Sequence, residues 1–248
     1  MSNIILSTAA TDNYMVKMIP YLNSIEQYSN FDKNIFISLG HDYNGPHFSK
    51  IETLSMSLDD VLTKNQNNGL QHGDFLYCKI FDTINQNDYI CFTDGDIIMQ
   101  RPMLDAEKDM ILSLKDNEVL VQYNANKNDS LYSESHRIKP QINIDTFFDK
   151  YLCFNTGVII CNKKTYQYLE HMYRVIHPIV RNIFHHYAAQ QWTLSYIINS
   201  FMKPIILDYS FHMHHHYGHV EGESYKDNKI YYNDTLVLFA HHITGISG

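Results

Sequence analysis

The sequence has no surplus of positive charge, because 27 aspartate and glutamate residues outnumber 19 lysine and arginine residues and give a net charge of −8. This balance argues against a nucleic-acid-binding protein, which normally presents a basic face. It is compatible with a small polyanionic ligand, because a bound divalent cation can supply positive charge locally. Hydrophobic residues make up 44% of the chain and charged residues 19%, which allows a sizeable core and excludes wholesale disorder.

The sequence also lacks closely spaced cysteines. Its four cysteines are Cys78, Cys91, Cys153 and Cys161, and no two of them have the short spacing of a zinc knuckle or a redox CxxC motif. The last three lie in apolar runs, where a free cysteine behaves as a small buried hydrophobic residue. We therefore expect reduced cysteines, no catalytic thiol and a cytoplasmic protein.

Long apolar runs are absent as well. Nowhere do about 18 apolar residues follow one another, so no membrane span is expected. The first strand-like run, residues 3–7, is not preceded by a basic leader or followed by a cleavage signal. No internal repeat and no Ser/Gly-rich linker divides the chain, so the simplest expectation is one domain over residues 1–248.

Short apolar runs and helical spacings alternate along the chain, which is typical of an α/β fold with a mostly parallel, Rossmann-like central sheet flanked by helices. The predicted strands are 4–8, 34–39, 51–56, 89–92, 97–99, 154–161 and 236–240, and the predicted helices are 14–28, 75–84, 163–176 and 188–201. Residues 122–147 are polar and irregular, and we expect a mobile loop there.

An acidic turn stands between two of the predicted strands. Asp94 and Asp96 flank Gly95 directly after the apolar run 89–92, and a second apolar run follows at once. Asp-Gly-Asp is common in ordinary turns, but ligands in open α/β sheets collect beyond the carboxyl ends of strands. Two carboxylates at such a place suit Mg²⁺ or Mn²⁺, which also bind diphosphate oxygens. The turn therefore predicts a metal site.

Two histidines near the end of the sequence could add a metal ligand to this turn. His241 and His242 end the last predicted strand, and one neutral imidazole could complete the coordination begun by the two aspartates. A denser cluster, His212, His214, His215, His216 and His219, contains no carboxylate or cysteine. We interpret this cluster as part of a loop near an acceptor pocket in preference to a second metal site.

Six segments, in order, resemble the family-8 glycosyltransferases, a retaining group with the GT-A fold that includes glycogenin and lipooligosaccharide galactosyltransferases. The segments are Ile4 to Tyr14 together with Ser24-Ile25, Tyr77-Cys78-Lys79-Ile80-Phe81, Tyr89 to Ile98 with its DxD turn, Phe154-Asn155-Thr156-Gly157-Val158, Gln190-Gln191-Trp192-Thr193-Leu194, and His242-Ile243-Thr244-Gly245. The resemblance implies a GT-A domain with its nucleotide-binding part at about 1–100 and its acceptor and catalytic part at about 101–248. It also implies sugar transfer from a nucleotide-diphosphate sugar, expected to be a UDP-sugar, to a hydroxyl acceptor on a glycan, lipid-linked molecule or protein.

The resemblance further assigns roles to individual residues. Asp94, Asp96 and His242 would bind Mn²⁺ or Mg²⁺. Lys79 would reach the donor sugar or its phosphate, Asn155 would line the donor-sugar site, and Gln191 would lie near the reacting face of the sugar.

The same resemblance places the nucleotide at the end of the first strand. Tyr14 would stack on the base, Asn13 would touch the ribose, and Ala9, Thr11 and Asp12 would belong to this nucleotide-binding start. Gly245 would close the site as part of the His-x-x-Gly motif.

The sequence departs from the family pattern at three places. Thr11 stands where the family usually has an acidic residue that reads uracil, with Asp12 as the neighbour that could compensate. Gln190 stands where an acidic residue normally precedes the helical glutamine. Gly248 occupies the position of a diphosphate-binding lysine, so Lys79, Lys203 or another basic residue would have to substitute.

Other functions stay open at this point. An inverting GT-A transferase or a nucleotidyltransferase could also use an acidic turn, and an inverting enzyme would need a carboxylate base, for which Asp145, Asp149 and Asp208 are unassigned. A noncatalytic module that binds nucleotide sugars is the alternative from another class. The donor sugar, the acceptor and the oligomeric state are not determined by the sequence.

Overall fold

A computed structural model describes residues 2–11, 14–40, 42–57, 83–124, 151–184, 189–213 and 220–241. Within residues 151–184, side chains are described up to residue 181. The first half contains β1 (Ile4–Thr11), α1 (Met15–Tyr28), β2 (Lys33–Leu39), β3 (Ile51–Met56), β4 (Tyr89–Thr93), β5 (Ile97–Met99), α2 (Asp105–Leu112) and β6 (Glu118–Tyr123). The second half contains β7 (Phe154–Asn162), α4 (Lys163–Phe184), α5 (Ala189–Phe201), β8 (Lys203–Ile206), β9 (His212–Met213), β10 (Glu223–Lys226), β11 (Lys229–Tyr232), β12 (Thr235–Leu236) and β13 (Phe239–His241).

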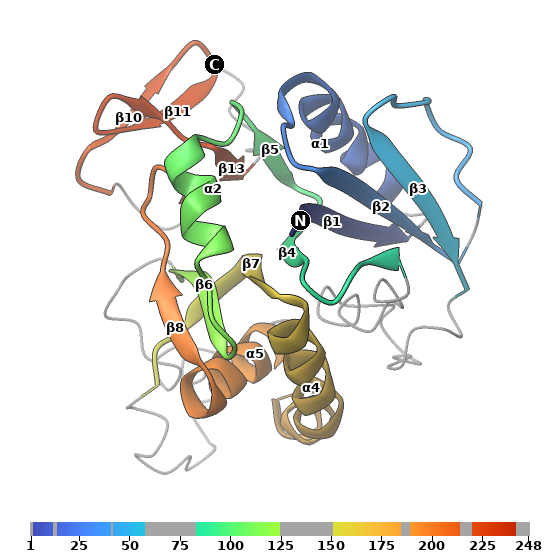
Figure 1. The fold of residues 1–248 in the computed structure, drawn as a ribbon, viewed down its shortest axis with the longest axis vertical. Helices are drawn as coiled ribbons and strands as arrows, with labels where there is room; N and C mark the ends of the chain where they lie inside the picture. Colours follow the sequence, from blue (N-terminus) through green and yellow to red (C-terminus); the bar gives the residue numbers. More distant parts are fainter. Residues whose placement is uncertain are drawn as a thin grey trace.

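A seven-stranded sheet with the order β3-β2-β1-β4-β7-β6-β8 runs through the protein (Figure 1). The pairs β3–β2, β2–β1, β1–β4 and β6–β8 are parallel, whereas β7 is antiparallel to both of its neighbours, β4 and β6. The prediction of a mostly parallel central sheet is therefore confirmed. Because β7 runs the other way, its first residues lie at the carboxyl end of β4, where the acidic turn begins.

Both faces of this sheet are covered, which explains why inner strands such as β1 and β4 are buried over nearly their whole length. One face packs on α4 and α5, through residues such as Ile90 and Leu194. The other face packs on α1, α2 and the C-terminal strands, through residues such as Leu6, Leu22 and Phe239. Two smaller sheets, β10-β11-β12 and β5-β13-β9, complete the described fold.

The predicted elements agree with the structure where periodicity is strong and differ at their ends. The strand predicted over 51–56 is found with those bounds, and the first strand continues from 8 to Thr11. The helix predicted to end at 176 continues through Pro178 to Phe184, because packing on α5 outweighs a proline penalty of about 3 kcal/mol. Helix α2, strand β6 and the short strands from β8 to β11 are not among the predicted elements. The prediction also joined β12 and β13 into one strand over 236–240, although Val237 and Leu238 interrupt them.

Two predictions fall largely on residues that the structure does not describe, the helix over 75–84 and the loop over 122–147, although residues 122 and 123 belong to β6. Within the described part, no helix is both long enough and apolar enough to cross a membrane. Cys91, Cys153 and Cys161 are buried and form no disulfide bond. Burial raises the pKa of the Cys91 and Cys161 thiols, which keeps them protonated and unreactive.

A buried histidine between α4 and α5 makes stability depend on pH. His177 Nδ1 lies 3.0 Å from the Thr193 hydroxyl, which itself donates to the Ala189 carbonyl, and the ring stacks on Tyr173. Desolvation, with a smaller contribution from Arg181, lowers the pKa of His177 from 6.5 to about 4. The unfolded chain therefore binds a proton that the folded protein excludes between these pH values.

We expect the free energy of unfolding to fall by up to about 3 kcal/mol as the pH drops from 6.5 to 4, because each pKa unit corresponds to about 1.4 kcal/mol. Urea unfolding at several pH values measures this change. His177→Asn, which offers an amide donor in place of Nδ1, should flatten that part of the profile. An unchanged profile in the variant would show that other groups cause the acid sensitivity.

Candidate active site around the acidic turn

The acidic turn lies where the sequence analysis placed it, between β4 and β5. Asp94 follows the last residue of β4, and Asp96 precedes the first residue of β5. Since β4 is parallel to β1, the carboxyl ends of both strands meet at the same edge of the sheet. The Asp96 side chain is 61% exposed, so this carboxylate is accessible to a ligand from solvent.

Helix α1 holds this turn through three residues on one of its faces. The Tyr21 hydroxyl lies 2.7 Å from Thr93 Oγ1, just before the turn, and the Ser24 hydroxyl accepts a hydrogen bond of 3.0 Å from the Met99 amide, after it. Between them, Met18 packs against Gly95, where a β-carbon would overlap the methionine sulfur. The spacing of 18, 21 and 24 places the three side chains on one helix face. Gly95 is thus needed for space as well as for the bend.

Adding a single methyl group at this turn tests that packing. We expect Gly95→Ala to lower the free energy of unfolding by about 1–3 kcal/mol, the usual cost of overfilling a packed site. It should also weaken Mn²⁺ binding, because the turn must move and carry both carboxylates with it. Urea unfolding and metal titration measure the two effects.

A double-mutant cycle provides the control for this prediction. In a Met18→Ala background the obstructing sulfur is absent, so Gly95→Ala should cost less there than in the unmodified chain. Equal costs in the two backgrounds would show that Met18 is not the group that requires glycine.

Strand β7 supplies the side of the site that faces Asp94. The Asp94 amide donates a 2.9 Å hydrogen bond to the Gly157 carbonyl, and the Asn155 side-chain oxygen accepts a 2.8 Å bond from the Gly157 amide. A β-carbon on Gly157 would lie 2.9 Å from Asn155 Oδ1, 3.1 Å from His241 Nε2 and 3.4 Å from Asp94 Oδ2. Three polar atoms from three strands or turns therefore converge above this glycine. A glycine inside a strand often marks such a close approach, which is a signal that the sequence analysis did not use.

The histidine that the structure brings to this point is His241 on β13. It pairs with Ile97 of β5, the residue after Asp96. Its side chain is buried, with Nδ1 3.8 Å from Asp96 Oδ1. A second buried imidazole, His212 of β9, lies beside it with ring centroids 5.3 Å apart. His242, the predicted metal ligand, lies outside the described residues.

Strand β9 is itself attached to the main sheet. Gln122 of β6 donates a 3.1 Å hydrogen bond to the His212 carbonyl, and Gln122 pairs in register with Asn155. His212 is the one member of the predicted histidine cluster that the structure describes. It belongs to the buried base of the site, which corrects its assignment to an acceptor loop.

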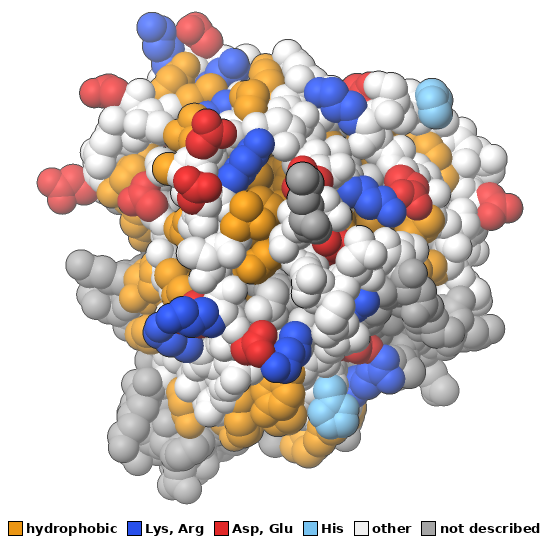
Figure 2. Space-filling model, viewed as in Figure 1, with side chains coloured by type: hydrophobic (Ala, Val, Ile, Leu, Met, Phe, Trp, Pro, Cys, Tyr) orange, Lys and Arg blue, Asp and Glu red, His pale blue; other side chains and the backbone are white. Residues whose placement is uncertain are grey.

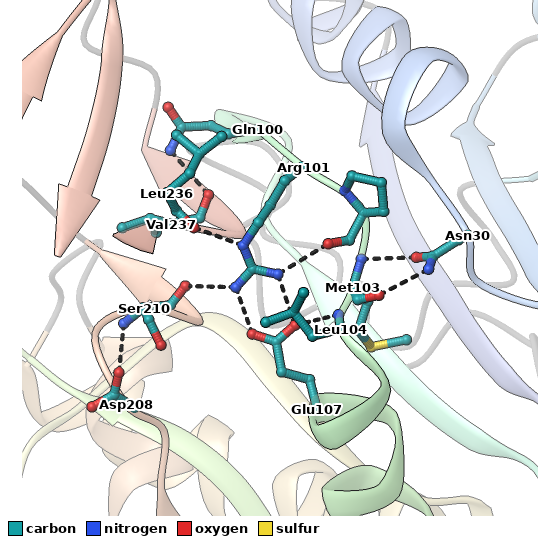
Figure 3. A network of polar contacts seen from close by, with 11 residues as sticks. Asn30, Gln100, Arg101, Met103, Leu104, Glu107, Asp208, Ser210, Leu236 and Val237 are labelled. Atoms are coloured by element: carbon teal, nitrogen blue, oxygen red, sulfur yellow. Dashed lines mark hydrogen bonds and ion pairs between the residues drawn. The ribbon is translucent and has the colours of Figure 1, made fainter. Parts of the chain in front are cut away.

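A network around Arg101 ties the C-terminal strands to the segment that follows the acidic turn (Figure 3). Its guanidinium donates two bonds to the Glu107 carboxylate, at 2.6 and 2.8 Å, and the others to backbone carbonyls. Those carbonyls are Leu236 at 2.6 Å, Pro102 at 2.9 Å and Ser210 at 3.2 Å. All five guanidinium donors are thereby used. Ser210 and Leu236 lie shortly before β9 and β13, so this network positions the strands that carry the two histidines.

The predicted nucleotide-binding residues lie at the carboxyl end of β1, as far as the structure describes them. Ala9 and Thr11 end this strand, and Tyr14 directly precedes α1 with an exposed ring. Lys17 Nζ lies 4.9 Å from the centroid of that ring. Asp12 and Asn13, and likewise Lys79 and Gly245, fall outside the described residues.

Gln191 lies in the first turn of α5, which packs on β7. Its amide group donates toward Cys153 Sγ at 3.5 Å, two residues before Asn155. The structure therefore places Gln191 near the start of β7, on the same strand segment that supplies Asn155 and Gly157. The neighbouring Gln190 and Trp192 are buried in the packing of this helix.

Two residues to which the sequence assigned no definite role, Lys203 and Asp208, make structural contacts. Lys203 begins β8 at the sheet edge, and its ammonium group lies 2.8 Å from Glu118, where this bond lowers the pKa of the carboxyl group. It is therefore not the cation that stands in for the lysine expected at 248. Asp208 caps a turn by accepting a hydrogen bond of 2.9 Å from the Ser210 amide, which gives this carboxylate a structural role.

The donor set at the turn suits a hard divalent cation. Asp94 and Asp96 provide carboxylates, Asn155 provides an amide oxygen, and His241 provides an imidazole, which together match the ligand types of Mn²⁺ and Mg²⁺. Within the described part of the chain, no three acidic, histidine or cysteine side chains are already arranged around one metal position. The convergence of polar atoms above Gly157 is the feature that fits a bound ion, and the fit would be completed by movement of the exposed Asp96 side chain.

A hollow of about 440 Å³ lies at the opposite edge of the sheet, at the amino ends of β2 and β3. Its charged side chains are already engaged, since Lys33 pairs with Glu52 at 2.7 Å and Lys50 donates to the Ser29 carbonyl at 3.2 Å. The carboxyl edge is the better site because its carboxylates converge with other polar groups.

No protein-family model matches this sequence, and no curated protein resembles it in sequence. Solved structures are similar to it. One is the galactosyltransferase LgtC in complex with donor and acceptor sugar analogues, with a TM-score of 0.57 and 14% identity over 96% of this chain and 87% of that chain. Another is an active-site mutant of LgtC in which glutamine is replaced by glutamate, with a TM-score of 0.60 and 15% identity over 97% and 88% of the two chains. The chain has the GT-A fold.

This fold confirms the architecture expected from the sequence resemblance. The similarity to LgtC covers 96–97% of this chain, and the mostly parallel seven-stranded sheet fits that fold. At 14–15% identity the similarity concerns the fold, and the chemistry has to be argued from the residues at the site.

Proposed function

We propose that this protein is a glycosyltransferase that moves a sugar from a nucleotide-diphosphate sugar to a hydroxyl acceptor. The observation that carries the proposal is the convergence of Asp94, Asn155 and His241 above Gly157, with Asp96 beside them. This cluster lies at the carboxyl end of β4, next to that of β1, where ligands bind in open α/β sheets. The GT-A fold and the similarity to the structure of LgtC with donor and acceptor sugar analogues support it.

Each group at the site has a proposed task. Asp94 and Asp96 would hold Mn²⁺ or Mg²⁺ together with an imidazole, either that of His242, as the sequence resemblance implies, or that of His241, which lies beside them. This ion would neutralise the negative charge of the departing nucleoside diphosphate. Asn155 would orient the donor sugar through its amide, and Gln191 would lie at the reacting face. The active site of LgtC contains a glutamine that was changed to glutamate, and we propose Gln191 as its counterpart in this chain. Lys79 and Gly245 keep the donor contacts that the sequence resemblance implies.

The nucleotide is proposed to lie against the end of β1, with Tyr14 stacked on a uracil base and Asp12 and Asn13 beside the ribose. Ala9 and Thr11 would form the floor of this part. UDP is the proposed carrier, and retention of the anomeric configuration is proposed on the same sequence resemblance. We place the reaction in the cytoplasm, because three buried cysteines without disulfide bonds fit a reducing compartment.

One assay tests the function directly. The protein is incubated with a panel of UDP-, GDP- and ADP-sugars, with Mn²⁺ or with EDTA, and nucleotide release and the anomeric configuration of the product are followed. We expect release from a UDP-sugar that requires metal and gives a product of unchanged configuration. Binding without any release over the whole panel would identify the noncatalytic alternative, and an inverted product would identify an inverting transferase.

The structure offers one cation for the diphosphate among the described lysines and arginines near the turn. Lys17 is exposed on the first turn of α1, next to Met18, which packs on Gly95, and above the Tyr14 ring. We propose that it replaces the lysine expected at 248.

Lys17→Met should weaken the binding of UDP about tenfold, which corresponds to one charge-assisted hydrogen bond of about 1.4 kcal/mol, and should leave the binding of uridine unchanged. Isothermal titration with both ligands measures this difference. An equal loss for UDP and uridine would assign Lys17 to the base side of the site.

A further inference from the structure

Two consecutive hydrogen bonds inside the protein link α4 to the first turn of α5. These helices pack against each other at the lower end of the molecule (Figure 1), and hydrophobic side chains gather on the outer surface of that end (Figure 2). Inside, His177 Nδ1 lies 3.0 Å from the Thr193 hydroxyl oxygen, which lies 2.7 Å from the Ala189 carbonyl oxygen. His177 is 1% exposed and Thr193 is 0% exposed, so water does not compete for these bonds.

The hydroxyl group of Thr193 determines the direction of both bonds. Its one proton is donated to the Ala189 carbonyl, so the hydroxyl oxygen accepts from His177, and Nδ1 carries the ring proton. The other ring nitrogen, Nε2, is buried and has no hydrogen-bond partner among the described residues. A buried imidazole with one unpaired nitrogen is an unfavourable way to fill an apolar space. What His177 contributes at this position is therefore the bond that it donates to Thr193.

The turn that this link holds carries Gln191 and covers the start of β7. Ala189 and Trp192 pack on Cys153, and the Gln191 amide donates to Cys153 Sγ at 3.5 Å. Gln191 lies between Ala189 and Thr193, the two residues that the hydroxyl bond joins. A displacement of this turn would carry Gln191 with it.

We propose that His177 is a positioning residue for Gln191, which it holds at the start of β7 through Thr193 and the first turn of α5. This role rests on the proposed function, in which Gln191 lies at the reacting face of the sugar, whereas the hold on α5 is a property of the fold alone. Displacement of an orienting group by about 1 Å can slow a reaction about 100-fold. Loss of the link should therefore slow sugar transfer more than it weakens binding of the donor.

Two substitutions of Thr193 separate the link from simple packing. Thr193→Val keeps the volume of the side chain and removes the hydroxyl group, whereas Thr193→Ser keeps the hydroxyl group and removes a methyl group. We expect Thr193→Val to lower kcat about tenfold and to change KM for the nucleotide sugar by less than about twofold. Thr193→Ser should retain most of kcat. The reverse order of the two variants would assign a packing role to Thr193 and overturn the inference.

The same comparison applies to His177 at the other end of the link. Asparagine places an amide nitrogen near the position of Nδ1, and glutamine places it nearer that of Nε2. His177→Asn should therefore keep more of kcat than His177→Gln, although it leaves the larger void. Ile198→Val removes one methyl group from the buried face of α5, so it should lower stability in urea unfolding and leave kcat unchanged. A fall of kcat in Ile198→Val equal to that in Thr193→Val would overturn the inference.

Alkylation of Cys153 by iodoacetamide tests the hold on α5 in the full chain without any turnover. The reagent reaches a buried thiol only when its cover opens, and mass spectrometry of the Cys153 peptide measures the rate. We expect Thr193→Val and His177→Gln to raise this rate about tenfold, the effect of one lost hydrogen bond, and to leave the rates at Cys91 and Cys161 unchanged.

The pattern of labelling decides between local and global opening. An unchanged rate at Cys153, or an equal rise at all three buried cysteines, would overturn the inference. If Cys153 alone is labelled faster but the original chain turns over no nucleotide sugar, the proposed function fails, and the hold of His177 on the first turn of α5 is supported. Faster labelling of Cys153 with an unchanged kcat would show that this hold does not position Gln191.

Discussion

Asp96→Asn is expected to lower the metal-dependent rate of nucleotide-sugar turnover by about 100-fold, or about 2.7 kcal/mol in the activation barrier. The substitution keeps the size of the side chain and removes the negative charge that an exposed carboxylate offers to a divalent ion. The neutral amide binds such an ion more weakly, so charge on the leaving diphosphate would be left without its counter-ion. The initial rate at saturating Mn²⁺ measures the effect.

Two further measurements make this result specific. The Mn²⁺ affinity, followed by the electron paramagnetic resonance signal of the free ion, should fall together with the rate, while the free energy of unfolding should stay within about 0.5 kcal/mol of the original value. Asp109→Asn, the same change on an exposed face of α2, should alter neither. Full activity in Asp96→Asn would remove the acidic turn from the mechanism.

The largest expected loss of stability follows from Arg101→Met. The Arg101 and Glu107 side chains are only 11% and 12% exposed, and removal of one partner leaves the other charge without compensation, which typically costs about 3–5 kcal/mol. Three backbone carbonyls lose their donor at the same time. Urea unfolding measures the global effect, and hydrogen exchange should show the earliest opening in segments 207–213 and 230–241.

Two control variants distinguish the loss of the Arg101 network from the loss of a positive charge at another place. Lys164→Met removes the cation of an exposed pair with Asp116, whose side chains are 67% and 52% exposed, and a loss of only about 0.5 kcal/mol is expected there. In the double variant Arg101→Met with Glu107→Met, the uncompensated charge is absent, so much of the stability should return. If Arg101→Met proved no more harmful than Lys164→Met, the C-terminal strands would be held mainly by their apolar core.

These two predictions concern different parts of the same site. Asp96 would act on the ligand directly, whereas Arg101 acts through the strands that carry His212 and His241. Arg101→Met is therefore expected to weaken Mn²⁺ binding only as far as β13 separates from β5, and low temperature should restore the binding. Asp96→Asn should show no such recovery, because its defect is chemical and not conformational.

The local sequence determined most of the strands and helices of the central sheet and the position of the acidic turn. Strands β2 and β4 could be predicted because they are apolar runs buried on both faces of the sheet, and α1 could be predicted from its helical spacing. The acidic turn could be placed because Asp94 and Asp96 directly follow a buried strand. Resemblance to the family-8 glycosyltransferases then gave the GT-A fold correctly, although single motifs were short, because they occur in the expected order.

Tertiary structure decided how the site is assembled. The reversed direction of β7 brings Asn155 and Gly157 to the end of β4, and a sequence pattern does not reveal strand direction. Strand β9 has only two residues, too few for any periodicity, so the approach of His212 to the turn could not be predicted. A histidine near the turn was expected from the end of the strand predicted over 236–240, and the structure shows that His241 of β13 lies there. In the sequence, Met18, Tyr21 and Ser24 look like ordinary helix residues. Only the packing of α1 across the acidic turn shows that they hold this turn in place. Sequence thus determined which chemistry is present, while contacts between residues far apart in the chain decided where it converges.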